Sequence, residues 1–349
     1  MKPRNLPPHK HKGVALITVL LVVAIVSLIA VQMSERLQVQ LRRTSAMLTL
    51  NDAKWVNIGA EGFAKKVLDQ DFSDSSEKSH LEQYWASGDV TFPLENGGMF
   101  SGRIKDLQGC FNLNGVVKLE SEVAELRQTG ERNLGAKQFL ALLEALEVES
   151  YQAEIMADSL QDWLDADDYV DQSTGAEDSE YLSRSQPYLA ANGPLADVGE
   201  MRAINGFTRE AVKKIWNYVC VIPGTSRQQI NVNTVEKAQV FMAMFTPNLT
   251  REQAEQLISD RPSDGYDSIE DFFASAALSG VGVTDRVKGQ FTVLSEHFLV
   301  ESETRLDSGT TLYTQSTLKR NSSEWAVTSR RFGGQGERVP DTEVSESGF

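Results

Sequence analysis

The chain has 349 residues, of which 41% are hydrophobic and 24% are charged, as expected for a folded protein with enough apolar material for a core. Its 49 acidic and 34 basic residues give a net charge of −15. An acidic body repels nucleic-acid phosphates and anionic lipid head groups, so the charge disfavours nucleic-acid binding and favours cations or basic partners.

The N-terminus has a basic segment followed by an apolar one. Four basic residues precede Gly13, and the nineteen residues 14–32 carry no charge. Nineteen helical residues span roughly 28 Å, which is about the thickness of a bilayer core. The basic residues predict a cytoplasmic N-terminus, with the rest of the chain outside the cytoplasm.

Two processing routes compete for this segment. A secretory signal needs small residues before its cleavage site, and a cut after Ala30 would place the large Leu28 at position −3. The basic leader, single glycine and long apolar run instead resemble the leaders of type IV prepilins. The resemblance implies cleavage by prepilin peptidase between Gly13 and Val14, N-methylation of Val14, and a retained helix that anchors the protein and later packs in a filament.

Thr18 occupies the fifth position after Gly13. Most members of the prepilin class have Glu there, paired with the amino terminus of the adjacent subunit. A carboxylate among apolar helices is costly without such a cation. Thr18 therefore indicates a subunit with no neighbour above it, at the tip of a filament.

Apolar residues continue at helical spacing over residues 33–70 without a proline, which predicts one helix over 14–69 with residues 14–32 transmembrane. Residues 89–95 and 99–105 flank Asn96-Gly97-Gly98 and predict a β-hairpin. Residues 290–332 alternate like three further strands.

Sheet-forming segments thus lie on both sides of a long helical stretch. The economical fold class is α+β, with the long N-terminal helix packed on an antiparallel pilin-like sheet and a large helical insertion. The expected head comprises residues 70–120 and 286–332, the insertion residues 121–285, and a polar tail residues 333–349 that we expect to be disordered. Helices within the insertion are predicted at about 121–129, 136–147, 151–164, 197–202, 208–218, 234–245, 250–260 and 267–277.

Two stretches of the insertion, 198–216 and 232–261, resemble helix-hairpin-helix units, each with a threonine as predicted N-cap of its second helix. Such units bind phosphate through glycine-rich turns. The second turn, 245–249, has no glycine, and acidic residues surround both turns. A helical scaffold is therefore favoured over the alternative of a membrane-anchored DNA-uptake protein.

Residues 158–181 form an acidic stretch with nine Asp or Glu residues. Clustered carboxylates repel one another unless a cation compensates them, and Ca²⁺ takes six to eight oxygen ligands. An EF-hand starting at Asp165 is excluded, because its sixth and twelfth positions are Val170 and Ala176. The residues alone leave open an irregular metal site or a solvated loop, although the interspersed aromatic residues favour a folded loop.

Residues suited to catalysis are sparse. The four histidines form no H-E-x-x-H motif, and the chain has no G-x-S-x-G or Walker sequence. A single-pass membrane enzyme, the second alternative, would need a pocket with converging titratable groups. Cys110 and Cys220 would be buried thiols in a cytosolic protein and a possible disulfide in an exported one.

These features together resemble one family. The leader ending at Gly13, the apolar run from Val14, the GCFNLN of 109–114, the DWLDADD…GAEDSEY of 162–181 and the INVNT of 230–234 are similar to the minor pseudopilin K family of type II secretion systems. Threonine in place of the usual glutamate agrees with that family.

The resemblance implies a structural subunit rather than an enzyme. Members cap the periplasmic pseudopilus, start its assembly with minor pseudopilins I and J, and serve the export of folded proteins across the outer membrane. The implied location is the inner membrane, with a single pass and a periplasmic head.

The resemblance also implies Ca²⁺ in the acidic loop and a Cys110–Cys220 disulfide that ties the insertion to the sheet. The calcium ligands carried over to this chain are Asp162, Asp165, Asp167, Asp168, Glu177 and Asp178.

Overall fold

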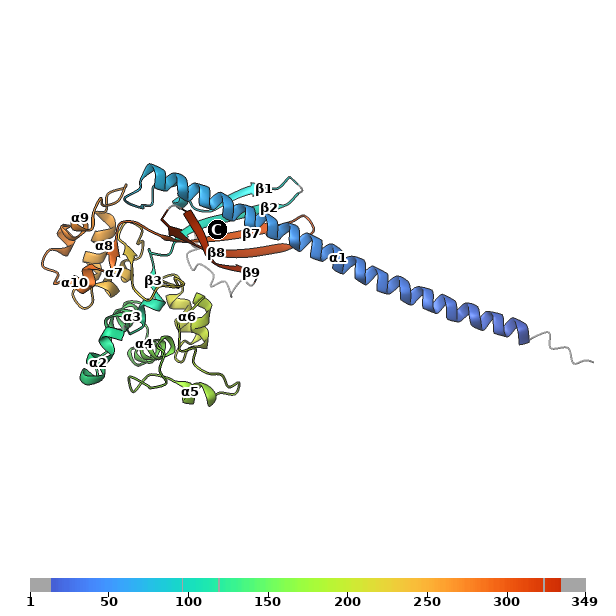
Figure 1. Ribbon diagram of the computed structural model, residues 1–349, viewed down its shortest axis with the longest axis horizontal. Helices are drawn as coiled ribbons and strands as arrows, with labels where there is room; N and C mark the ends of the chain where they lie inside the picture. The colour runs from blue at the N-terminus through green and yellow to red at the C-terminus, as the bar shows by residue number, and fades with distance from the viewer. Residues whose placement is uncertain (1–13, 96, 119, 323, 334–349) are drawn as a thin grey trace, which may run out of the picture.

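A computed structural model describes residues 14–95, 97–118, 120–322 and 324–333 (Figure 1). The predicted leader, including Gly13, and the predicted tail from residue 334 lie outside the described residues. Helix α1 (Val14–Asp74) is one continuous helix of 61 residues, which confirms the single predicted helix and extends it beyond residue 69. It projects far from the folded head (Figure 1).

The two halves of α1 have different surroundings. Its apolar N-terminal part is long and apolar enough to cross a membrane and is not buried in the protein. Within that part, the Thr18 hydroxyl donates a hydrogen bond to the Ala15 carbonyl at 2.9 Å. In the C-terminal part, Ala53, Asn57, Glu61, Ala64, Leu68 and Asp71 recur at three- and four-residue spacing and are buried.

The buried side of α1 packs on a five-stranded antiparallel sheet with strand order β1-β2-β7-β8-β9 (Figure 1). The N-terminal hairpin pairs with the C-terminal strands through β2 and β7, where Ile104 lies opposite Val300. This arrangement confirms the predicted α+β fold. The strands are β1 (Val90–Pro93), β2 (Met99–Asp106), β7 (His297–Arg305), β8 (Thr311–Asn321) and β9 (Glu324–Phe332).

A small apolar core joins α1 to the sheet. Phe298 lies between Trp85 and Trp325, with ring centroids 5.2 and 5.4 Å away. Leu68 of α1 and Leu318 of β8 are buried in the same cluster. Alternating side chains of the strands therefore cover the helix, while the other face of the sheet carries polar residues such as Glu301 and Gln315.

The helical insertion has its own, larger core. Phe111 and Leu113, which follow the first hairpin in the sequence, are fully buried in this core rather than in that of the sheet. Phe111 stacks on Phe139 with centroids 5.7 Å apart. The α-helices are α2 (Glu120–Thr129), α3 (Leu134–Ala145), α4 (Ser150–Leu164), α5 (Asp178–Leu182), α6 (Arg209–Ile215), α7 (Ala238–Met244), α8 (Arg251–Ser259), α9 (Ile269–Phe273) and α10 (Asp285–Lys288).

Most predicted helices of the insertion are present, and two short ones, α5 and α10, were missed. Both are polar segments of only five and four residues, too short to show a helical apolar period. The predicted N-caps are confirmed: Thr208 Oγ1 accepts from the Ala211 amide and Thr250 Oγ1 from the Gln253 amide. The first of the paired hairpins opens with a 3₁₀ helix, Val198–Ala203, rather than an α-helix.

The glycine of the first hairpin turn is used for packing. Gly206 has a φ of +83°, and a Cβ at this position would lie 2.7 Å from Ile155 Cγ2 of α4. Its carbonyl accepts a hydrogen bond from the Gln152 side chain. The turn is thus pressed against α4 and does not present its backbone to a phosphate.

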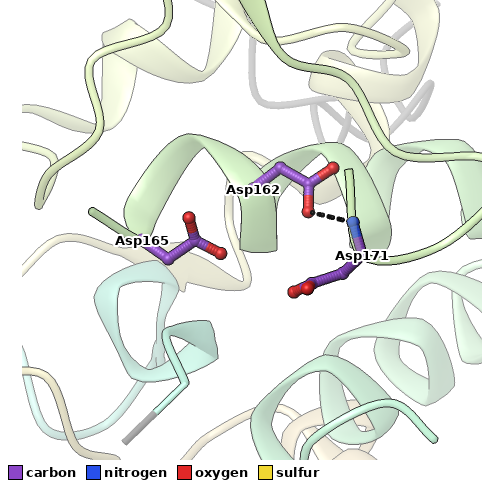
Figure 2. Close-up of side chains that lie close together, drawn as sticks. All are labelled: Asp162, Asp165 and Asp171. Carbon is purple, nitrogen blue, oxygen red and sulfur yellow. Dashed lines mark hydrogen bonds between the residues drawn. The ribbon is translucent and has the colours of Figure 1, made fainter. Parts of the chain in front are cut away.

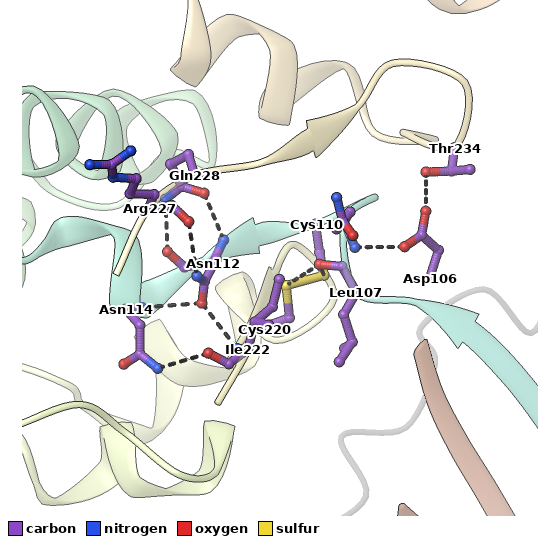
Figure 3. The surroundings of a disulfide bond; sticks show 11 residues. Asp106, Leu107, Cys110, Asn112, Asn114, Cys220, Ile222, Arg227, Gln228 and Thr234 are labelled. Atoms are coloured by element: carbon purple, nitrogen blue, oxygen red, sulfur yellow. Dashed lines mark hydrogen bonds between the residues drawn. A yellow bond between two sulfur atoms is a disulfide. The ribbon is translucent and has the colours of Figure 1, made fainter. Parts of the chain in front are cut away.

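The insertion and the sheet are joined at several points (Figure 3). Cys110 and Cys220 form a disulfide with a Cα–Cα distance of 5.9 Å, beside the parallel pairing of β3 (Phe111–Asn112) with β4 (Val219–Cys220). Close by, the Asp106 carboxylate at the end of β2 accepts hydrogen bonds from Thr234 and Ser295 at 2.6 and 2.5 Å. A second parallel pair, β5 (Ile230–Asn231) with β6 (Phe291–Thr292), returns the chain to the sheet.

Candidate metal centre

Helix α4 and the loop after it place acidic side chains inside the insertion. Asp158 and Asp162 lie one turn apart on α4, and Asp165 follows at its C-terminal end. The exposed fractions of these three side chains are 1, 0 and 7%, so all three acidic residues are buried. Aspartates at this spacing lie on one side of a helix, so three carboxylates point into the same part of the protein.

Three carboxylates converge at the end of α4. Oxygen atoms of Asp162, Asp165 and Asp171 all lie within 4.8 Å of one another (Figure 2). The Asp171 amide donates to Asp162 Oδ1 at 3.4 Å, which holds the returning loop against the helix. We call these three residues the aspartate triad.

Within the part of the chain that the structure describes, several oxygens around the triad have no hydrogen-bond partner. Asp162 Oδ2 and both carboxylate oxygens of Glu177 are buried and unpaired. Burial, together with the charges of Asp171 and Asp165, raises the pKa of Asp162 to about 8. Burial and the charge of Asp165 likewise raise the pKa of Glu177 to about 7. Among the described residues neither Asp162 nor Glu177 has an ion-pair partner, so this donor set fits a hard cation.

Gly175 brings the loop backbone close to the triad. A Cβ on this residue would lie 2.0 Å from Asp162 Oδ2 and 3.2 Å from the Gln172 carbonyl. Only a residue without a side chain leaves the Asp162 carboxylate in its observed position.

Lys118 lies in the middle of these acids and was not identified from the sequence. Its Nζ is 2.8 Å from Asp165 Oδ2 and also pairs with Asp171, and its side chain is only 4% exposed. The residue comes from the segment between the 3₁₀ helix Leu113–Val116 and α2, far from the acidic loop in sequence. The available signal was a single lysine in the otherwise apolar run VVKL of 116–119.

The predicted ligands fall into two groups. Asp162 and Asp165 belong to the triad, and Glu177 is buried close by. The triad also contains Asp171, which was not among the predicted ligands. The remaining three have hydrogen-bond partners that hold the loop: Asp167 accepts from the Tyr169 amide, Asp168 from the Asn192 side chain, and Asp178 from the Ala190 amide.

Asp158, the first acid of α4, is compensated within the protein. Arg132 contacts its two oxygens at 2.6 and 2.8 Å, and Thr174 donates a third hydrogen bond. An arginine fork leaves few lone pairs free, so Asp158 is a structural residue and not a further metal ligand.

Aromatic rings pack against one another within the acidic stretch and next to it. Trp163 meets Tyr181 at 5.1 Å between centroids, and Tyr181 meets Tyr188 at 5.4 Å. The Arg184 guanidinium lies 4.8 Å from the centre of the Tyr181 ring. This packing confirms the expectation of a folded loop for Trp163 and Tyr181, whereas Tyr169, the third aromatic residue of the stretch, is 73% exposed.

Two models of the family described as "Type II secretion system (T2SS), protein K" match this chain, over residues 109–224 and 230–293. Together they cover the insertion, including the triad, Lys118 and both cysteines.

Curated relatives and one solved structure agree with these matches. The chain is 36% identical to type II secretion system protein K of Aeromonas hydrophila over 74% of this chain and 78% of that protein. It is 32% identical to that of Klebsiella pneumoniae over 93 and 97%. A chain of the crystal structure of the GspK–GspI–GspJ complex from enterotoxigenic Escherichia coli matches with a TM-score of 0.72 at 33% identity, over 84% of this chain and 99% of that one.

Proposed function

The chain belongs to the type II secretion system protein K family, and we propose that it is the minor pseudopilin at the tip of the pseudopilus. In this role it starts filament assembly with minor pseudopilins I and J, for the export of folded proteins across the outer membrane. The observation that carries the proposal is the match, over 84% of this chain, to a chain of the GspK–GspI–GspJ complex. The homologues are structural pseudopilins rather than enzymes.

The N-terminal part of α1 supports a membrane anchor that is kept in the filament. Apolar side chains such as Leu21 and Ile25 are 60 and 49% exposed, which is unfavourable in water and favourable in lipid or against neighbouring helices. The basic leader orients the helix in the inner membrane with the head in the periplasm. Prepilin peptidase would cut between Gly13 and Val14, and Val14 would then be N-methylated.

Thr18 supports a tip position. Its hydroxyl is satisfied by the Ala15 carbonyl of its own helix, so it needs no partner from a neighbouring subunit. A glutamate at this depth would need a cation from the subunit above. The subunit can therefore end a filament without leaving a buried charge unpaired.

The helical insertion supports the same position. It lies at the end of the molecule that is distant from the apolar N-terminal part of α1, largely to one side of the helix axis (Figure 1). We infer that its bulk would hinder the stacking of a further subunit on the head. The mechanism is thus mechanical: α1 packs among the helices below, and the insertion ends the filament.

We assign Ca²⁺ to the aspartate triad, with Glu177 as an additional ligand. The ion would supply the positive charge that the unpaired oxygens of Asp162 and Glu177 lack. It would hold the end of α4 to the returning loop. Asp167, Asp168 and Asp178 lie in the same loop and stay predicted ligands.

The complex with the partners is the direct test. The full-length chain, solubilised in detergent, is mixed with tagged pseudopilins I and J, and co-purification is measured. We expect a stable ternary complex, whereas a major pseudopilin in place of I and J serves as the control. Failure to co-purify under any calcium condition would contradict the proposal.

The mature N-terminus gives a second, independent test. Mass spectrometry of the chain from cells with prepilin peptidase should show a start at Val14, and cells without the peptidase should keep the leader. A start after Ala30 would instead support an ordinary signal peptide. Salt-dependent DNA binding by the purified chain would support the DNA-uptake alternative.

A further inference from the structure

Lys118 occupies the position in which a metal ion would be held. Its ammonium lies against two of the three triad carboxylates, 2.8 Å from Asp165 and in an ion pair with Asp171. An ammonium carries one positive charge and a divalent cation carries two, so both cannot remain between the same oxygens without strong repulsion. Binding of calcium and the present position of Lys118 exclude each other.

We propose that Lys118 is an internal counterion that neutralises the triad in the absence of calcium and is displaced when calcium binds. The proposal rests on the calcium assignment made above and adds a mechanism that sets its affinity. Without either cation, the buried carboxylates of Asp162, Asp165 and Asp171 would repel one another. Lys118 therefore keeps the calcium-free protein folded, at the cost of competing with the ion.

The structure provides space for the displaced side chain. A cavity of about 440 Å³ lies next to Lys118, between α2 and the acidic loop, and is lined by residues that include Val123, Leu126 and Tyr169. The lining combines apolar side chains with polar ones such as Glu131 and Gln172, which suits a lysine, whose stem is apolar and whose head is charged. The ammonium can thus move to solvent without unfolding the surrounding helices.

Displacement of the Lys118 side chain would affect helix α2. Val116, two residues before Lys118, is fully buried in the insertion core, whereas α2 begins two residues after it. Lys118 itself is held by its ion pairs with Asp165 and Asp171. Loss of those ion pairs would lower the stability of the N-terminal end of α2, so calcium binding would change the order of that helix.

Chemical labelling of the wild-type protein tests the displacement directly. Full-length protein in detergent is treated with an amine-acetylating reagent in EGTA or in saturating CaCl₂, and acetylation of single lysines is measured by mass spectrometry. We expect acetylation of Lys118 to rise about tenfold in calcium. Lys137 is the matched control, because its ion pair with Glu131 is 46% exposed on the lysine side and lies outside the triad.

Calorimetry of a Lys118→Met variant tests the competition. Calcium should bind about tenfold more tightly than to the wild type, because no ammonium has to leave. The unfolding midpoint of the variant should fall in EGTA and return to the wild-type value in saturating calcium, whereas Lys137→Met should behave as the wild type in both respects.

The outcomes separate this proposal from the one it rests on. Calcium binding by the wild type, with Lys118 still protected from acetylation or with unchanged or weaker affinity in Lys118→Met, would overturn the displacement and leave the calcium site intact. Calcium binding by neither protein would overturn the metal assignment and the displacement together, while co-purification with pseudopilins I and J would be unaffected.

Discussion

Arg330 of β9 donates two hydrogen bonds of 2.8 Å each to Glu61 of α1, from Nε and Nη2 to the two carboxylate oxygens. The Glu61 side chain is 7% exposed, so this bond fixes the long helix to the outermost strand from inside the helix–sheet interface. Fork-shaped pairs of this kind are the stronger class of ion pair.

Replacing Arg330 with Met should lower the free energy of unfolding by about 3 kcal/mol, because it leaves the buried Glu61 carboxylate without a counterion. Urea unfolding followed by circular dichroism measures this change. Arg305→Met is the matched control: its pair with Glu303 is 68% exposed on the arginine side and should contribute less than about 1 kcal/mol. Equal effects of the two substitutions would contradict the assignment.

Replacing Asp162 with Asn should abolish the calcium-dependent rise in the unfolding midpoint. In EGTA at neutral pH the same variant should be more stable than the wild type, because a carboxyl whose folded pKa is raised to about 8 costs stability above its ordinary pKa near 3.8 and an amide does not. Thermal unfolding with and without calcium measures both effects. Glu180→Gln changes an exposed acid of the same stretch and should keep the wild-type response, and loss of the response there too would point to a diffuse charge effect.

Gly175→Ala should weaken calcium binding at least about tenfold, because the new Cβ takes the space of Asp162 Oδ2 and turns a ligand aside. Calorimetric titration measures the affinity. Gly193→Ala is a suitable control, since the nearest atom to its Cβ would be the Ala191 carbonyl oxygen at 3.6 Å. An unchanged affinity in Gly175→Ala would exclude Asp162 as a ligand.

Reduction of the Cys110–Cys220 disulfide should destabilise the head. The bridge closes a loop with a sequence separation of 110 residues, and loops of this length contribute up to about 4.7 kcal/mol by restricting the unfolded chain. The paired variant with both cysteines changed to serine should show this loss in urea unfolding. Two free thiols in unfolded, unreduced protein from the periplasm would show that the bridge does not form there.

The surroundings of Glu301 predict that the free energy of unfolding falls in acid. Burial alone would raise the pKa of this carboxyl, but nearby Lys105 and Arg103, with hydrogen bonds from Gln315 and Arg103, lower it to about 2. Because the folded pKa lies below the ordinary value near 4.5, the stabilisation is complete above pH 4.5 and disappears as the pH falls through about 2. The full effect is about 3 kcal/mol.

Unfolding free energies measured between pH 2 and 6 check this prediction. Glu301→Gln should flatten the decline below pH 4.5, and Glu324→Gln, which changes an exposed residue of β9, should not. A decline of the same steepness in all three proteins would assign the acid sensitivity to other groups.

Local patterns were enough to predict most of the fold. The long helix α1, the first hairpin and the three C-terminal strands follow from periodicity and turn residues, which act between neighbours in the sequence. The N-caps Thr208 and Thr250 belong to the same class of signal. The packing of Phe111 and Leu113 in the insertion core was not predictable, because two apolar residues beside a strand suit either core equally well.

At the acidic site, too, some features follow from the sequence and others only from tertiary packing. The sequence by itself determined the acidic stretch of 158–181 and excluded an EF-hand there, whereas Asp162 and Asp165 were named as ligands through the family resemblance. It also determined a helix long and apolar enough to cross a membrane, because that apolar length needs no tertiary contact. The tertiary structure alone decided that Asp171 completes the triad, that Asp167, Asp168 and Asp178 hold the loop, and that Lys118 neutralises the centre. The physical reason is that burial and charge compensation depend on which distant segments pack together, and a lysine carries no local sign of the carboxylates it will face.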